Sequence, residues 1–221
     1  MTGSTEKATG RRAVVPRLDG PVPADARARL TRALEESIEA TGYRNTTITD
    51  IVRLAKASRR TFYRVFSTKD DVLIALMDDV NLELMRNLRD SVDPVQPWRR
   101  QIEASIAVFF DQIAARPAVH LCYIRDLPYL GEIAEPVIRQ STDEFADLIC
   151  AMTDNDEFRR GGLEPATRLQ ALMVQGALNE LVSEVLRVGG DVRDHIALAV
   201  AGTTALLSAA PRESSEAGSV S

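Results

Sequence analysis

The chain has 221 residues, of which 27 are basic and 32 acidic, and its formal net charge at pH 7 is -5. A chain of this length can bury a core that is stable without disulfides. Its two cysteines, Cys122 and Cys150, form no C-x-x-C pair, and we interpret them as reduced thiols in a cytoplasmic protein. No uncharged apolar run reaches about 18 residues, and the N-terminus has no apolar segment, so we expect neither a membrane span nor a secretion signal.

Basic charge is concentrated in one part of the chain. Residues 44–69 carry seven Lys and Arg residues against one acid, Asp50, which gives a local balance of +6. Residues 24–72 contain ten basic and seven acidic residues, whereas residues 73–221 contain 13 and 23. The net charges of these two parts are therefore +3 and -10. This asymmetry indicates a phosphate-binding module on an acidic body.

Helical spacing of apolar residues dominates the chain, and no alternating strand pattern appears. We predict an all-α protein with an N-terminal three-helix domain of the helix-turn-helix type at residues 24–71 and a larger helical domain at residues 72–210. The segments 1–23 and 211–221 have little to bury, and we predict them to be disordered tails.

The first predicted helix, residues 24–41, ends at Gly42. Thr47 can cap the next helix together with Asp50, in an imperfect capping box because the usual partner is Glu or Gln. The apolar face of this second helix contains Ile48, Ile51, Val52 and Ala55.

A short turn at Lys56 and Ala57 leads to a third predicted helix, which Ser58 caps and which runs to about residue 65. Phe62 and Phe66 are four residues apart, so both should point inward. The same spacing leaves four polar residues outward or flanking: Arg59, Arg60, Tyr63 and Arg64.

The remaining predicted helices build the larger domain. A long helix should start at Ser67 or Thr68, end near Asp90 and bridge the two domains, with Trp98–Ala115 following after two prolines. Prolines and Gly131 divide the next section into short pieces. After it we expect a helix at residues 133–152, a polar loop at 153–162, and two final helices at 164–188 and 192–209.

Residues 42–71, GYRNTTITDIVRLAKASRRTFYRVFSTKDD, strongly resemble the DNA-binding module of the tetracycline-repressor (TetR) family. The matching positions are Gly42, Tyr43, Thr46, Thr47, Ile51, Ala55, Ser58, the segment 61–64, Phe66 and Lys69. The resemblance implies that the remaining helices form a ligand-binding and dimerising domain.

The chain departs from the pattern of this family at three positions. Lys56 stands where the turn commonly has Gly, so we predict a left-handed backbone there at a cost of roughly 1 kcal/mol. Arg60 replaces a residue that is often small and adds a long cation to the surface. Val65 stands where His is frequent.

In helix-turn-helix proteins the second helix of the motif enters the major groove, while other residues fix the position on the backbone. The resemblance places Thr47, Tyr63 and Lys69 against phosphates. We predict Arg59, Arg60 and Thr61 as base readers and Arg64 in either role, since arginine can donate two hydrogen bonds to guanine. With the cap residue, the predicted DNA-binding set is Thr47, Ser58, Arg59, Arg60, Thr61, Tyr63, Arg64 and Lys69. The alternative is a basic helix face that is merely solvated.

Aromatic residues, including Tyr129, are concentrated in the middle of the chain. The predicted ligand-binding set is Phe109, Phe110, His120, Tyr123, Phe145 and Met152. An aromatic stripe at helical spacing can equally be core. His120 and Cys122 lie two residues apart without an acidic cluster, so we expect neither a metal nor another cofactor.

The last two predicted helices suit a homodimer, because a single module reads only a few base pairs. Their apolar stripes are Leu169, Leu172, Met173, Gly176, Ala177 and Leu181 on one helix and Ile196, Val200, Thr203 and Leu207 on the other. The same stripes could serve the core within one chain.

Together these features predict a regulator, most simply a repressor, that binds a roughly palindromic double-stranded DNA operator as a homodimer and is released by an unidentified small-molecule effector. The alternative is a constitutive or partner-controlled DNA-binding protein without an effector. We do not expect an enzyme, because the sequence has no G-x-S-x-G, phosphate loop or metal cluster.

Overall fold

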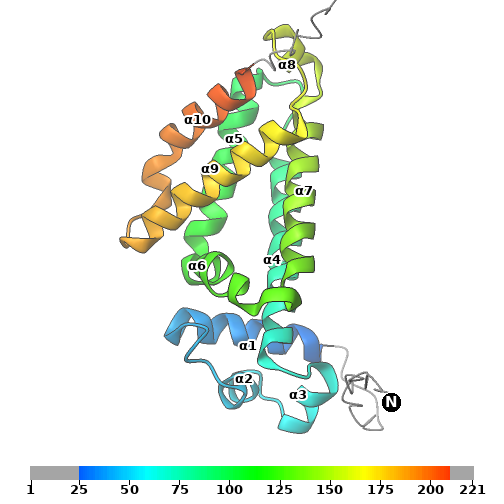
Figure 1. The fold of residues 1–221 in the computed structure, drawn as a ribbon, viewed down its shortest axis with the longest axis vertical. Helices are drawn as coiled ribbons and strands as arrows, with labels where there is room; N and C mark the ends of the chain where they lie inside the picture. The colour runs from blue at the N-terminus through cyan, green and yellow to red at the C-terminus, as the bar shows by residue number, and fades with distance from the viewer. Residues whose placement is uncertain (1–24, 210–221) are drawn as a thin grey trace, which may run out of the picture.

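The computed structural model describes residues 25–209, in which every regular element is a helix (Figure 1). The predicted tails at 1–23 and 211–221 lie outside this range. The N-terminal part contains α1 (Ala26–Thr41), α2 (Ile48–Leu54) and α3 (Arg59–Val65). The remaining elements are α4 (Lys69–Ser91), α5 (Trp98–Ala115), α6 (Pro117–Arg125), the 3-10 segment η1 (Leu127–Ile133), α7 (Glu135–Thr153), α8 (Asp156–Arg160), α9 (Arg168–Arg187), η2 (Val192–His195) and α10 (Ile196–Ser208). The predicted all-α class is confirmed.

Local signals fix the first three helices. Gly42 ends α1 with a φ of 80°, a conformation that glycine adopts without a steric penalty. Thr47 and Asp50 form both hydrogen bonds of a capping box at the start of α2. Ser58 caps α3 by accepting a hydrogen bond from the Thr61 amide. Lys56, in the turn between α2 and α3, has a φ of 48° and is the non-glycine residue of the described chain with a left-handed backbone, as the sequence predicts.

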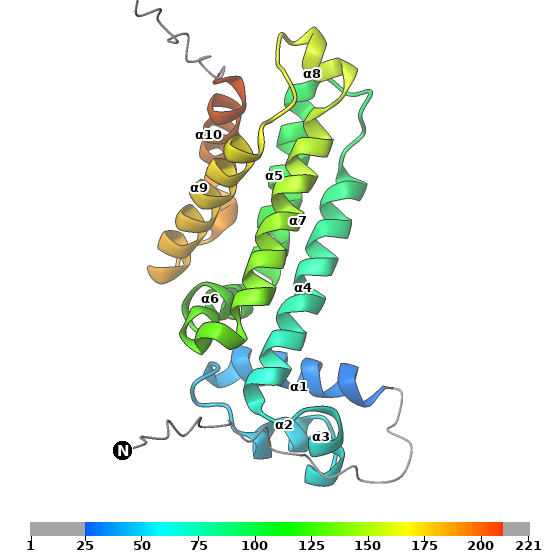
Figure 2. The ribbon, with the colours of Figure 1, turned by 45° about the vertical axis from the view of Figure 1, so that its right-hand side comes forward.

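The long helix α4 joins the two parts of the molecule. Thr68 and Asp71 form a second capping box at its start, and a buried face continues along it from Val72 to Leu88. Its first turns pack against α1, while its later turns pack against α5 and α7 in the body (Figure 2). The helix therefore belongs to both parts.

Two apolar cores lie one above the other along α4. The first combines α1 to α3 with the start of α4 and continues into α6, η1 and the start of α7, through Val119, Cys122 and Val137 among others. The second contains the later part of α4 with α5, α7, α8, α9 and α10. The division between the cores falls between Val80 and Leu84, so the first core extends beyond the three-helix module.

Two features of the body differ from the sequence prediction. Residues 156–160, predicted as part of a loop, form the short helix α8, because Asn155 caps it and Phe158 buries its ring against Trp98, with 6.0 Å between ring centroids. The last predicted helix begins as the 3-10 turn η2, which Asp191 caps, before α10 starts at Ile196. No helix among residues 25–209 is long and apolar enough to span a membrane.

Candidate DNA-reading surface and ligand cavities

The helix α3 lies at the end of the molecule remote from α8 (Figures 1 and 2). Phe62 is fully buried and Phe66 nearly so, and both anchor α3 to α1 and α2. Ser58, Arg59 and Arg60 are exposed, and for the two arginines this exposure is as the sequence predicts. A helix with a buried aromatic side and an exposed basic side has the form of a major-groove reader.

Neighbouring side chains hold the predicted readers of α3 in place. The Arg59 Nη2 donates a hydrogen bond of 2.7 Å to the hydroxyl of Thr49 on α2. The hydroxyls of Ser58 and Thr61 lie 2.9 Å apart and share a hydrogen bond. Tyr63 is 42% exposed, although its ring stands edge-on to that of Phe62. The contact with Thr49 couples the two helices of the motif and was not predicted from the sequence.

Thr47 is exposed at the start of α2, where the first helix of the motif would meet the DNA backbone. Its hydroxyl donates to the Asp50 carboxylate at 2.6 Å, and its amide donates to the same oxygen at 3.0 Å. These hydrogen bonds from Thr47 lower the pKa of Asp50. The carboxylate therefore stays charged and holds the N-terminal turn in place.

Lys69 has a structural role that the sequence did not predict. Its ammonium donates to the carbonyl oxygens of Tyr43 and Thr46, at 2.9 and 3.0 Å, and lies 4.1 Å from the centroid of the Tyr43 ring. The Tyr43 hydroxyl donates to Asp70, and burial raises the pKa of this tyrosine far above its usual range. Lys69 thus fastens the start of α4 to the loop between α1 and α2, and its predicted phosphate contact has to share the ammonium with these carbonyls.

Arg44 belongs to the basic segment in sequence but is bound to the body in space. Its Nε donates to the Asp126 carboxylate at 2.8 Å, and its guanidinium lies 5.2 Å from the centroid of the Tyr129 ring. Tyr129 is 80% exposed and lines neither of the two cavities in the body. Arg44 therefore joins the module to the end of α6.

Two neighbouring cavities lie inside the body. The first, which we call the α8-side cavity, has a volume of about 70 Å³ and an almost wholly apolar wall. Its lining residues are Leu88, Val92, Gln101, Ile102, Ser105, Ile106, Phe109, Phe145, Leu148, Ile149, Met152, Thr153, Phe158, Val174, Leu178, Thr203 and Leu207.

The second, which we call the α6-side cavity, has a volume of about 50 Å³ and a partly polar wall. Its lining residues are Met77, Val80, Asn81, Leu84, Phe109, Val119, His120, Tyr123, Ile124, Ser141, Phe145, Gln175 and Asn179. Phe109 and Phe145 line both cavities, and their rings meet edge-on with 6.1 Å between centroids.

The structure brings most of the predicted ligand-binding residues to these cavities. Phe109, His120, Tyr123 and Phe145 line the α6-side cavity, and Met152 lines the α8-side cavity. Phe110 lines neither, because its side chain is fully buried in the second core. The other polar residues of the α6-side wall, Asn81, Ser141, Gln175 and Asn179, were not predicted from the sequence. Glutamine or asparagine on an otherwise apolar helix face, as in α9, is the signal that could have found them.

Burial controls the ionisation of two groups near the α6-side cavity. It lowers the pKa of His120 to about 4, with Arg116 as a further cause, so the imidazole is neutral at pH 7. It also raises the pKa of Cys122 to about 12, which keeps this thiol protonated and poorly nucleophilic. Neither residue belongs to a group of three or more potential metal ligands in the described part of the chain.

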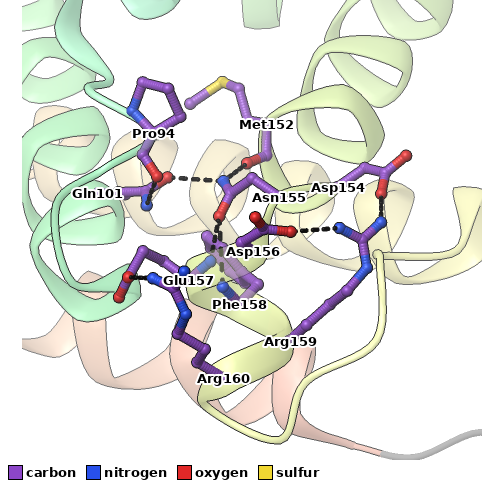
Figure 3. Close-up of polar contacts among 10 residues, drawn as sticks. All are labelled: Pro94, Gln101, Met152, Asp154, Asn155, Asp156, Glu157, Phe158, Arg159 and Arg160. Carbon is purple, nitrogen blue, oxygen red and sulfur yellow. Dashed lines mark hydrogen bonds and ion pairs between the residues drawn. The ribbon is translucent and has the colours of Figure 1, made fainter.

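Beside the α8-side cavity, polar side chains at the start of α8 form a network of satisfied hydrogen bonds (Figure 3). Gln101 donates to the carbonyl of Gln96 at 2.7 Å and accepts a hydrogen bond of 2.9 Å from Asn155. The Asn155 Oδ1 in turn accepts from the amides of Glu157 and Phe158. These contacts hold α8 over the ends of α5 and α7.

The outer surface of α9 and α10 is apolar. Leu169, Met173 and Leu198 are 73%, 57% and 61% exposed. Small exposed residues surround them, namely Gly176, Ala177, Ala197, Ala201, Gly202 and Ala205. Thr203 and Leu207, part of the predicted stripe on the last helix, are instead buried in the core. The free surface of α10 therefore lies on the side of Leu198 and Gly202.

Comparisons with known proteins agree with this arrangement. Residues 30–76 match the family model described as bacterial regulatory proteins, tetR family. The fold is similar to that of the transcriptional regulator FadR from Bacillus subtilis, solved in complex with stearoyl-CoA, at 17% identity over 82% of this chain and 97% of that chain, with a TM-score of 0.68. It is also similar to the reduced form of Escherichia coli NemR, at 15% identity over 84% and 100% of the two chains, with a TM-score of 0.66.

A third similar structure is a bacterial regulatory protein in the tetR family from Rhodococcus RHA1, at 20% identity over 85% of this chain and 100% of that chain, with a TM-score of 0.61. At these identities the solved structures establish a shared fold. No curated protein sequence matches the chain. The tetR family model thus covers the DNA-binding module at residues 30–76, and the chain shares the fold of the solved regulators.

Proposed function

We propose that this protein is a homodimeric transcriptional repressor of the cytoplasm that leaves its DNA operator when a small molecule enters the body. The observation that carries the proposal is the separation of two sites along α4, with a basic reading helix at one end and two internal cavities beyond it. The readers are Arg59, Arg60 and Thr61, supported by Ser58, Arg64 and the phosphate contacts of Thr47, Tyr63 and Lys69.

The helix α6 offers a path of coupling between these sites. His120, Tyr123 and Ile124 of α6 line the α6-side cavity. Just past the end of the same helix, Asp126 accepts the hydrogen bond from Arg44 of the module. A ligand that displaces α6 would therefore change the position of the module, which is the differential contact that a population shift requires.

A second contact joins the start of α6 to the module. Arg116 directly precedes α6, and its Nη2 donates to Glu83 of α4 at 2.6 Å, while its Nη1 lies 3.5 Å from Glu35 of α1. This ion-pair group is partly buried, so removing one partner costs more than breaking a surface pair. Both ends of α6 are thus tied to the DNA-binding module.

The exposed apolar surface of α9 and α10 supports a homodimer. Large apolar side chains with exposures above one half, set among glycine and alanine, favour close helix packing between two copies. In a dimer the two α3 helices would lie on one side and would match two half-sites of a roughly palindromic operator.

The cavities favour a small-molecule effector over the alternative of a constitutive regulator with a filled core. The chemistry of the α8-side wall suits an apolar group. The complex of the structurally similar FadR with stearoyl-CoA supports an apolar chain as part of the effector.

The function can be tested through operator binding and through the oligomeric state. Selection from a random DNA library should yield a palindromic site, and fluorescence anisotropy with that site should show weaker binding once an effector from a ligand melting screen is added. Unchanged operator affinity with every bound ligand would support the constitutive alternative. For the dimer, sedimentation of Leu198→Glu should give monomers, whereas Leu82→Glu, at an equally exposed leucine of α4, should leave dimers intact.

A further inference from the structure

Three polar side chains of the α6-side cavity have no partner within the described chain. His120, Gln175 and Asn179 all line this cavity, and none of them makes a side-chain hydrogen bond to any residue between 25 and 209. Gln175 is only 9% exposed. Polar groups that line a cavity without a partner in the protein can bind water or a ligand there. These groups are therefore available to a molecule in the cavity.

The polar side chains at the α8 end, by contrast, have hydrogen-bond partners within the protein. Gln101 donates to the carbonyl of Gln96 and accepts from Asn155, and Figure 3 shows the second of these contacts. The Thr153 hydroxyl donates to the carbonyl of Ile149 at 2.9 Å and accepts from the amide of Ala166 at 2.9 Å. Almost none of the accessible wall of this cavity is polar. A ligand would find apolar surface at this end and unpaired hydrogen-bonding groups at the other.

The two cavities are neighbours, and two aromatic rings form part of the wall of both. Phe109 and Phe145 line both cavities and meet edge-on between them. The lining of α7 runs from Ser141 to Thr153, which is roughly 18 Å along a helix at about 1.5 Å per residue. Each cavity alone is small, so a ligand that occupies both must turn these rings aside, a rotamer change rather than a change of fold.

The charges around the α6-side cavity decide the kind of head group. None of the described residues in its lining carries a charge at pH 7, because burial keeps His120 neutral. Arg116, the nearby cation, is already bound to Glu83 and lies close to Glu35. A buried carboxylate or ammonium without a partner costs several kcal/mol, whereas an uncharged hydroxyl or carbonyl can pair with imidazole and amide.

We propose that the two cavities together bind one linear amphiphile, with an uncharged hydrogen-bonding head among His120, Gln175 and Asn179 and an alkyl chain that passes Phe109 and Phe145 into the α8-side cavity. The inference deepens the proposed function, on which it rests, by giving the effector a chemical class and an orientation. The polar head would lie against α6, the helix that is tied to the DNA-binding module at both ends.

Three probes with the same chain and different heads test the class of ligand. Decan-1-ol, decanoate and decyltrimethylammonium are titrated into the full-length protein at pH 7 by calorimetry. Decan-1-ol should bind about tenfold or more tightly than either ion. Equal binding of the three, or tighter binding of an ion, would overturn the assignment of an uncharged head.

Two readouts test the orientation. The chain has two histidines, so the imidazole nitrogen signals can be assigned with His120→Asn, and decan-1-ol should shift those of His120. Gln175→Leu keeps the size of the side chain but removes its donor and acceptor, and it should weaken decan-1-ol binding on the order of tenfold. The matched control is Gln140→Leu at an exposed position of α7, which should bind as the wild type does. No shift at His120, or equal affinities for the two variants, would place the head elsewhere and overturn the proposal.

The length of the alkyl chain of the probe tests whether one ligand occupies both cavities. From hexan-1-ol to decan-1-ol the affinity should rise by about fourfold per methylene, as burial of each added group predicts. A plateau at hexan-1-ol would confine the ligand to one cavity and overturn the two-cavity site. Operator binding without any probe is measured on the same protein, so a failure of the DNA-binding proposal is distinguished from a failure of the ligand assignment.

Discussion

The DNA-binding module and the body of this protein are specified in different ways. The module is built from signals within a few residues of each other, such as the capping boxes at Thr47 and Thr68 and the left-handed turn at Lys56. The body depends on contacts between residues far apart in sequence, such as Phe109 with Phe145 and Asn155 with Gln101. Local rules thus determine where the module presents its side chains, whereas packing determines what the body can enclose.

The largest effect should come from the exposed readers of the module. Arg59→Ala and Arg60→Ala should each weaken binding to the selected operator by about 1 to 3 kcal/mol, because each removes a possible bidentate contact to guanine. Anisotropy with operator and with scrambled DNA measures the effect. Arg187→Ala, at an exposed arginine of α9 that pairs with Glu184, is the control and should bind normally. An equal loss on scrambled DNA would show that the arginines contact phosphates instead of bases.

The second effect is a pH dependence of stability that arises in the body, at His120. The pKa of His120 is about 4 in the folded protein against 6.5 for the free side chain, so the unfolded chain takes up the proton first as the pH falls. Stability should therefore be full above about pH 6.5 and be lost between pH 6.5 and 4, by about 2 kcal/mol at pH 5. Urea unfolding at pH 7 and pH 5 measures this loss, and His120→Gln should reduce it. If the variant shows the same pH dependence as the wild type, His120 is not held neutral in the folded state.

Particular residues show which features of the fold and of the cavities can be predicted from the sequence. It predicted the bounds of α5, the cap of α3 and the inward direction of Phe62 and Phe66, because each depends on spacing or on a neighbour in sequence. It did not separate Phe110, which is core, from Phe109, which lines both cavities. Adjacent residues on an apolar helix differ only in what packs against them, and that is decided by distant segments.

The same reason explains the errors in the C-terminal part. Residues 156–160 look like a polar loop, and the burial of Phe158 against Trp98 adds to the Asn155 cap to make them a helix. On α10 the sequence offers apolar residues nearly all round, so it could not tell that Thr203 faces the core and Leu198 faces outward. The contact of Arg44 with Asp126 likewise joins segments that are far apart in the chain.

Breaking the ion pairs of Arg116, at the junction between the two regions, should destabilise the protein less than the protonation effect at His120. Arg116→Met leaves Glu35 and Glu83 partly buried without their cation, so we expect a loss of about 1.5 kcal/mol in the free energy of unfolding. Arg100→Met removes an exposed pair with Glu103 and should cost less than about 0.5 kcal/mol. Urea denaturation compares the two variants, and equal losses would mean that the pairs at Arg116 add no more than a surface pair.

The smallest expected effect concerns Lys56, where a substitution tests whether the left-handed turn has a local cost in stability. A left-handed backbone costs a lysine roughly 1 kcal/mol, and glycine adopts it freely, so Lys56→Gly should raise the free energy of unfolding by up to about 1 kcal/mol despite the larger entropy of glycine in the unfolded chain. Lys56→Ala removes the same charge but keeps the steric cost, so it should show no such gain.

The two Lys56 variants also separate charge from geometry on DNA. Both lack the ammonium, so any loss of phosphate attraction is common to them and falls with added salt in the same way. Because the turn already has the conformation that glycine prefers, both variants should present α3 identically and bind the operator with equal affinity. A difference between them would mean that the turn sets the position of the reading helix, and that the strain at Lys56 is part of DNA recognition rather than a local cost.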